Sequence, residues 1–279
     1  MAIKKPLLHY ALDEVRYNKE NDTSVIPNLG SLGGHGVVKG SPRIVHDSKI
    51  GTCLLFDGEE DYVEIKQPEK LKFQDGFSAA VWVRYDAFQK YSRIFDLNTT
   101  QNKSDNILFV ANSNNSKKII LGVKKDRFEL SSGIKADQWT HFAITQDKNG
   151  KIILYVNGNA VNEDNSKSFK MPDITWTMGY VGESSYDDNE KFKGAMAHLR
   201  MYDYALAAAE INTIMHNDQN SMAHYRETSL LKIDLYTVRD DDHKPVLYIE
   251  SDNKSEPLEV SLRNPHPTTP IKLDRKSVV

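Results

Sequence analysis

The stretch CLLFDGEEDYVEI, residues 53–65, places two short apolar runs on either side of an acidic connection. The first run is GTCLLFD (51–57) and the second is YVEI (62–65). Both are rich in β-branched or aromatic residues and are bounded by Gly or Asp, which is typical of strands. The stretch contains the carboxylates Glu59, Asp61 and Glu64, spaced as E-x-D-x-x-E. This stretch therefore predicts strands and also raises the question of a catalytic site.

Similar runs recur along the chain. They are FSAAVWVRY (77–85), RIFDL (93–97), NILFVAN (106–112), KIILGV (118–123), WTHFAITQ (139–146) and KIILYV (151–156). In the first of these, Phe77, Val81, Val83 and Tyr85 alternate with Ser78, Trp82 and Arg84, and a period of two indicates a strand. Hairpin turns are predicted at 147–150 and 157–158, where Asn-Gly pairs supply positive φ angles. Many short strands predict an all-β sandwich or jelly roll.

Only one segment shows helical periodicity. ALAAAEINTIMHN (205–217) places Leu206, Ile211, Ile214 and Met215 at helical spacing, which predicts a short amphipathic helix. The next ten residues, QNSMAHYRET (219–228), are polar and without periodicity, and we interpret them as a linker. Four further runs, within 229–238, 245–250, 257–264 and 270–274, predict strands. We therefore expect one domain over residues 1–224 and a β-rich extension over 225–279. The extension either packs on the first domain or is an incomplete second domain.

The order of these segments resembles the laminin G-like, concanavalin A-like jelly roll. The stretches that carry the resemblance are HYALDE, Gly34-His-Gly36 with VVKG, CLLFDGEEDYVEI, FSAAVWVRY, WTHFAITQDKNGKIILYVNGNAV and GYVGESSYDDNEKFKGAMAHLRMYDYALAAAEI. The resemblance implies two curved antiparallel sheets packed face to face. It also implies recognition of glycans or proteins, since most members bind one of these. Some relatives are glycosidases, and several carry a calcium ion.

On the basis of this resemblance, we interpret the acidic triplet as structural. It implies a turn at Gly58-Glu59-Glu60 and a strand from Tyr62 to Ile65. A retaining glycosidase needs two carboxyl groups about 5 Å apart on one concave face. On a regular strand Asp61 and Glu64 point to opposite faces, because side chains alternate. We therefore predict that Glu59, Asp61 and Glu64 are not catalytic.

The resemblance implies calcium as the candidate cofactor. Relatives place an acid in the last strand, where this chain has Ala197 and His198, and often an aspartate where it has Asn28. Ca²⁺ takes six to eight oxygen ligands, commonly including a carboxylate. Loss of these acids should weaken a calcium site strongly, so Ca²⁺ binding stays open and no metal ligand is assigned.

Bulk composition excludes several classes. The chain has 279 residues and a net charge of −3, so it lacks the basic footprint of a nucleic-acid binder or a polybasic membrane patch. No apolar run is long enough to insert across a bilayer, and no signal peptide is visible, which leaves the location open. Cys53 is the only cysteine and is interpreted as a buried structural thiol.

We expect a ligand at loops on the rim of the sandwich, because a packed scaffold leaves loops free to vary. Two polar regions are candidates: residues 98–106 with the neighbouring 112–116, and residues 184–190. Sugar recognition uses planar amides and carboxylates for hydroxyl pairs and an aromatic face for the C–H side. These needs select Tyr186, Asp187, Asp188, Asn112 and Asn114 as ligand-binding residues. The predicted function is non-catalytic recognition of a glycan or a protein surface. The alternatives are a structural module of a larger assembly, such as a phage-like or surface fibre, and a glycoside hydrolase.

Overall fold

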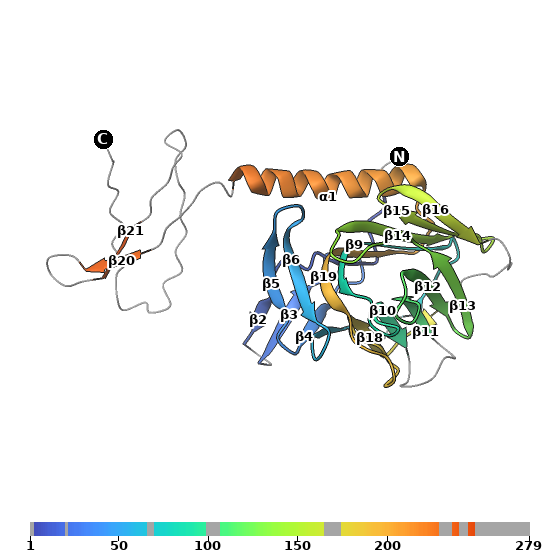
Figure 1. Ribbon diagram of the computed structural model, residues 1–279, viewed down its shortest axis with the longest axis horizontal. Coiled ribbons are helices and arrows are strands. Elements are labelled where there is room, and N and C mark those ends of the chain that lie inside the picture. The colour runs from blue at the N-terminus through green and yellow to red at the C-terminus, as the bar shows by residue number, and fades with distance from the viewer. Residues whose placement is uncertain are drawn as a thin grey trace. The chain divides into compact units, whose positions relative to one another are not determined.

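A computed structural model describes residues 3–19, 22–65, 70–98, 107–164, 174–228, 236–239 and 245–248. The chain divides into two compact units, Met1–Met222 and Ala223–Val279. The first unit is an antiparallel β-sandwich, as the alternating runs predict (Figure 1).

One layer of the sandwich is an eight-stranded sheet. Seven of its strands follow the order β16-β15-β14-β9-β19-β6-β5, and β1 also pairs with β19. Their bounds are β1 Leu8–Tyr10, β5 Arg43–Asp47, β6 Gly51–Asp57, β9 Phe77–Ala87, β14 Thr140–Gln146, β15 Ile152–Val156, β16 Asn159–Asp164 and β19 Lys193–Tyr202. The long strand β19 lies between β6 and β9, so a strand late in the sequence holds the centre of this sheet.

The other layer is a nine-stranded sheet in the order β13-β12-β11-β10-β18-β7-β4-β3-β2. Its strands are β2 Arg16–Asn18, β3 Thr23–Pro27, β4 His35–Lys39, β7 Tyr62–Ile65, β10 Arg93–Asn98, β11 Ile107–Asn112, β12 Lys118–Val123, β13 Asp126–Ser131 and β18 Met178–Val181. A small additional sheet pairs β8 Lys70–Leu71 with β17 Ile174–Thr175. The eight strand runs predicted within 51–156 all coincide with strands, with end shifts of a residue or two.

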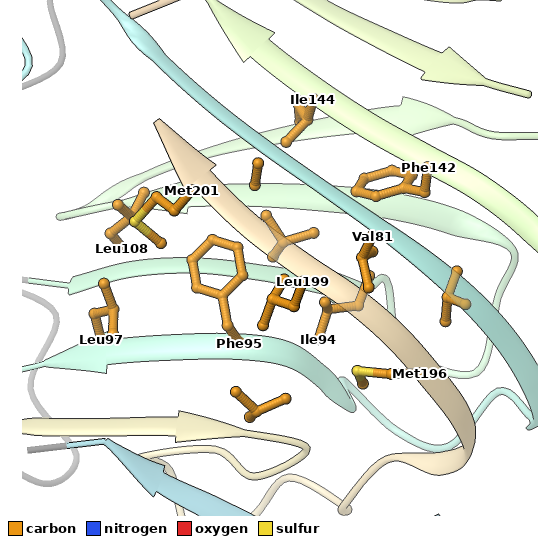
Figure 2. Close-up of a cluster of buried hydrophobic side chains, with 14 of the residues drawn as sticks. Val81, Ile94, Phe95, Leu97, Leu108, Phe142, Ile144, Met196, Leu199 and Met201 are labelled. Carbon is orange, nitrogen blue, oxygen red and sulfur yellow. The ribbon is translucent and has the colours of Figure 1, made fainter. Parts of the chain in front are cut away.

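The main core lies between the two sheets. Figure 2 shows Val81, Phe142 and Met201 of the eight-stranded sheet among Phe95 and Leu108 of the nine-stranded sheet. Strand β9 follows the predicted alternation, because Phe77, Val81, Val83 and Tyr85 join this core while Trp82 joins a cluster on the other side of its sheet. Burial of these apolar faces drives the packing of the two layers.

Helix α1 spans Ala208–Thr228, and its first part, up to Asp218, packs on the face of the eight-stranded sheet that points away from the core (Figure 1). We call this outer face the helix face. Ile211 and Ile214 pack against Ala143 and Tyr155, and Met215 packs against Trp82. The predicted helix therefore exists with its apolar side buried, but it begins at Ala208, so Leu206 precedes it.

The interpretation of residues 219–228 as a linker is wrong. The helix continues through this segment to Thr228 instead of ending near Asn217. The segment contains neither Gly nor Pro, the two residues that break helices most strongly, so the backbone can continue without an apolar stripe.

The second unit contains a described hairpin of β20 Tyr236–Arg239 and β21 Pro245–Tyr248. Strand β20 overlaps the run predicted at 229–238 and ends one residue beyond it, and β21 lies within the run predicted at 245–250. The runs predicted at 257–264 and 270–274 lie outside the described residues. The assignment of 225–279 as a β-rich extension stays a prediction.

Candidate functional site

The acidic connection of the opening stretch is an internally bonded turn. The Asp57 carboxylate Oδ1 accepts hydrogen bonds from the backbone N–H groups of Glu59, Glu60 and Asp61, at 2.7, 3.1 and 3.2 Å. Burial alone would raise the pKa of Asp57, but these amide groups together hold it below its ordinary value. Gly58 has a φ of +81°, a conformation that side chains rarely adopt.

The three acids of the triplet have separate structural surroundings. Asp61 is buried, and its two oxygens accept from the backbone N–H groups of Ser41 and Asp57. Glu64 Oε2 lies 3.4 Å from Lys39 Nζ on the neighbouring strand β4, and Glu59 is exposed at the turn. Asp61 therefore joins the turn to the start of the β5 segment, and the structure gives a scaffolding reason for its presence.

The two positions considered for calcium have other neighbours here. Asn28 Oδ1 accepts from the backbone N–H groups of His9 and Gly30, and its Nδ2 donates to Gly33 O. His198 occupies a bulge of β19 at a φ of +53° and lies 5.9 Å from the His9 ring. Among the described residues, no group of three or more His, Cys, Asp or Glu side chains is arranged to hold a metal ion.

A pocket of about 120 Å³ lies on the face of the nine-stranded sheet that points away from the core. We call this outer face the pocket face. Strands β10, β11 and β13 supply three lining residues, the connection between β9 and β10 supplies Tyr91, and the loop after β18 supplies the rest. The lining residues are Tyr91, Arg93, Phe109, Arg127, Tyr186, Asp188 and Asn189.

Arg93 and Phe109 form the buried base of this pocket. The Arg93 Cζ lies 3.9 Å from the centre of the Phe109 ring, a cation–π contact, and Arg93 is only 1 % exposed. Its Nε donates to Asp96 Oδ2 at 3.0 Å and its Nη1 donates to the carbonyl of Tyr91. The buried ion pair balances the charge of the guanidinium and fixes its plane against the ring.

Asp96 is held on its other side by the loop that follows β18. Its Oδ2 accepts from the backbone N–H of Ser185, and its Oδ1 accepts from the Ser185 hydroxyl. Burial raises the pKa of Asp96, while the Arg93 guanidinium and the Ser185 bonds oppose that rise. The network therefore ties strand β10 to the loop that carries Tyr186.

Aromatic rings form the rest of the pocket. Tyr186 lies with its ring centre 5.9 Å from Arg93 Cζ and packs against the cluster of Phe109, Ala111 and Ile120. Arg127 of β13 lies 5.9 Å from the ring of Tyr91. The pocket thus combines flat apolar faces with guanidinium donors and one exposed carboxylate, Asp188.

The structure brings together two of the five residues predicted to bind ligand, Tyr186 and Asp188. Asp187 and Asn114 are exposed beside these loops but do not line the pocket. Asn112 is buried, and its amide binds the Ser92 hydroxyl and the carbonyl groups of Gln89 and Asn114. Asn112 therefore holds two loops together, and the binding roles of all five residues stay predictions.

Sequence reasoning missed Arg93, Phe109 and Arg127. RIFDL and NILFVAN read as ordinary apolar strands, and their outward faces meet only through the antiparallel register that pairs Arg93 with Ala111 and Asp96 with Phe109. The available signal was an arginine inside an apolar run, followed by an aspartate three residues later. A charged pair in such a run indicates a buried ion pair.

Comparison with known proteins agrees with this fold. Residues 57–212 match the family model described as the concanavalin A-like lectin/glucanases superfamily. This match covers the turn, the central strands, the pocket loops and the start of helix α1. No curated protein sequence matches the chain.

Several solved structures share the fold at low identity. Domain 4 of AbnA, a GH43 extracellular arabinanase from Geobacillus stearothermophilus solved with arabinotriose, matches with a TM-score of 0.54 and 18 % identity over 76 % of this chain and 98 % of that domain. The binding domain of botulinum neurotoxin DC in complex with rat synaptotagmin II matches at 0.54 and 12 %, over 88 % and 62 % of the two chains.

A third similar structure is the binding domain of Paraclostridial Mosquitocidal Protein 1, with a TM-score of 0.55 and 12 % identity over 88 % of this chain and 64 % of that one. The chain therefore spans less than two thirds of these two toxin structures. At these identities the likeness shows the fold, and the similar structures are mainly binding domains.

Proposed function

Because the chain belongs to the concanavalin A-like lectin/glucanases superfamily, we propose that it is a non-catalytic binding module that holds a glycan in the pocket of its nine-stranded sheet. The observation that carries this proposal is the contact of the Arg93 guanidinium with the rings of Phe109 and Tyr186. Flat aromatic and guanidinium surfaces suit the C–H side of a sugar ring.

Polar groups around the pocket suit the hydroxyls of the same ring. Arg127 and Asp188 are exposed at its edge, one as a donor and the other as an acceptor. A vicinal pair of sugar hydroxyls can bind both kinds of group, because each hydroxyl donates and accepts. Tyr186 and Asp188 are thus the predicted residues that this proposal retains at the pocket, with Arg93, Phe109 and Arg127 added.

The size of the pocket limits the ligand. Its volume of about 120 Å³ is below the roughly 300–1,000 Å³ common for sites that enclose a drug-sized ligand. We expect it to accept one sugar unit of a longer glycan, such as a chain end or a branch, rather than to enclose an oligosaccharide.

The same geometry supports binding without hydrolysis. Glycosidases use two carboxyl groups, one on each side of the scissile bond. Asp188 is the only carboxylate among the residues that line the described pocket. The nearby Asp96 is committed to Arg93 and Ser185, so it is not free to attack a sugar or to protonate a leaving group.

The proposal is tested by glycan-array screening followed by calorimetric titration of the best ligand. Tyr186→Ala should weaken binding by about 1–3 kcal/mol, as loss of an aromatic anchor does. Tyr17→Ala is the matched control, because Tyr17 is an exposed tyrosine outside the pocket, and we expect it to bind like the wild type.

Two outcomes would overturn the proposal. An array without any glycan ligand would favour a protein surface or a structural role, which the fold also permits. Release of reducing sugar from a bound glycan would show that the module is catalytic.

A further inference from the structure

A buried ion pair joins helix α1 to the sheet beneath it. Arg200 of β19 contacts Asp218 of the helix through two hydrogen bonds, Nη1 to Oδ2 at 2.8 Å and Nη2 to Oδ1 at 2.6 Å. Both side chains are largely buried, with 11 % and 4 % of their surfaces exposed. A two-pronged contact of this kind fixes position as well as charge.

Three histidines surround this ion pair. His9 of β1 lies opposite Arg200 in the strand register, and its ring centre is 5.9 Å from that of His198. His198 Nδ1 lies 4.0 Å from Asp218 Oδ1. His141 of β14 is fully buried and packs 5.2 Å from the ring of Trp82.

The histidine rings have buried nitrogens that lack hydrogen-bond partners in the described structure. These atoms are His9 Nε2, His198 Nδ1 and both ring nitrogens of His141. A neutral ring tolerates such a site better than a charged one, since desolvation penalises the charged form. Burial lowers the pKa of His9 to about 3 and that of His141 to about 4, and it also lowers the pKa of His198.

Some charged neighbours lower the pKa values of these histidines, and others raise them. Arg200 disfavours a second positive charge on each of the three rings. Asp218 favours protonation of His141 and His198, and Asp13 favours protonation of His198. Tyr202 interacts electrostatically with Arg200, Asp218 and Glu210, but it stays protonated at acidic pH. Burial outweighs the carboxylates, because all three pKa values fall.

We propose that helix α1 is an acid-sensitive cover, which detaches from the eight-stranded sheet when His9, His141 and His198 become protonated. At pH 7 the rings are neutral whether the helix is bound or released. Below about pH 6.5 the released state takes up protons that the bound state does not, so binding of the helix weakens as the pH falls. For one histidine with a pKa of 6.5 when released and about 4 when covered, the shift at pH 5 is about thirtyfold.

The only cysteine of the chain reports on this cover. Cys53 is fully buried on the helix face, in the cluster that contains Trp82 and Met215 of helix α1. Release of the helix would expose the thiol while the core between the sheets stays closed. Cys53 is therefore a native probe for detachment.

The experiment uses the full chain and 4,4′-dithiodipyridine, a thiol reagent that works at acidic and neutral pH. The labelling rate of Cys53 is divided by that of free glutathione at each pH, and this ratio should rise at least tenfold from pH 7 to pH 5. Far-UV circular dichroism at pH 5 should retain the β-sheet signal, which distinguishes detachment from unfolding.

Histidine variants assign the effect. The triple variant His9→Gln, His141→Phe and His198→Asn should reduce the rise to less than threefold, and asparagine suits the positive φ of position 198. His35→Gln is the control, because His35 is exposed and outside the cluster, and it should keep the full rise.

Hydrogen exchange of the wild-type protein is a second measurement that needs no variant. The protection factors of amides in 208–218 should fall at pH 5, while those in β9 and β10 should not. Equal labelling ratios at both pH values, an undiminished rise in the histidine variant, or a uniform loss of protection would each overturn the proposal.

Discussion

On the helix face of the sandwich, Trp82 and Ala143 pack with residues of helix α1, and the ion pair between Arg200 and Asp218 is buried. On the pocket face, Phe109 and Ile120 also lie outside the main core, but two arginines, two tyrosines and an exposed carboxylate lie around them. Side chains alternate between the two faces of each strand, so each of the two sheets has one outer face. The difference between them comes from what is placed on top, a helix in one case and the loop that carries Tyr186 in the other.

From this contrast we expect residues of the helix face to contribute mainly to the stability of the fold, and residues of the pocket face to contribute mainly to ligand binding. If so, equivalent changes on the two faces should have different consequences. Ion pairs occur on both faces, and both contain tightly packed small residues, so matched substitutions are available.

The largest effect is expected from Asp218→Ala on the helix face. It leaves the Arg200 guanidinium buried without its partner, and breaking a buried pair in this way costs about 3–5 kcal/mol. The measurement is the free energy of unfolding in urea at pH 7.

The control for this substitution is the double variant Arg200→Met with Asp218→Leu, which removes both charges together and should be less destabilising than Asp218→Ala. A loss below about 1 kcal/mol in Asp218→Ala would mean that the ion pair does not hold the helix.

An intermediate effect is expected from Gly122→Ala on the pocket face. A Cβ at this position would lie 2.0 Å from Phe109 Cε1, so the ring has to move toward the pocket. Overpacking of this kind costs about 1–3 kcal/mol, and the displaced ring should also weaken glycan binding. Thermal unfolding and ligand titration measure the two parts.

Ala111 lies on the same face and pairs with Ile120 across β11 and β12, so Ala111→Gly provides a comparison that removes bulk instead of adding it. If Gly122→Ala left both stability and binding unchanged, the position of Phe109 would not define the pocket.

The smallest effect is expected from Glu129→Ala at the edge of the pocket face. Glu129 accepts from Lys118 Nζ at 2.8 Å and from the Ser113 hydroxyl at 2.6 Å, and both ionic partners are about half exposed. Exposed pairs contribute at most about 1 kcal/mol. A loss as large as that of Asp218→Ala, measured in the same urea titration, would remove the contrast between the two faces.

The strands could be predicted from the sequence because short apolar runs alternate and end at turn residues, as FSAAVWVRY shows for β9. The length of helix α1 could not, since the residues beyond Asn217 lack the apolar period that marks a buried helix face. Local sequence patterns do not predict where this helix ends, because they do not contain its tertiary contacts.

The pocket shows the same limit. Tyr186 and Asp188 were found because polar loops on a sandwich suggest recognition, and loop composition is visible in the sequence. Arg93 and Phe109 belong to different strands that read as core. Their approach depends on register and on the bulge between Arg93 and Phe95, which no local pattern specifies.

The position of strand β19 has a consequence for how the chain folds. Lys193–Tyr202 completes the eight-stranded sheet by pairing with β1, β6 and β9, whose residues precede it by more than a hundred positions. Such non-local pairing raises the contact order, and proteins rich in it fold slowly, in milliseconds to seconds. During synthesis the ribosome adds about 5–20 residues per second, so the early strands wait for seconds with the central position of their sheet vacant. The chain therefore passes through a period in which β6 and β9 are exposed edges, and a chaperone or rapid collapse has to protect them until β19 emerges.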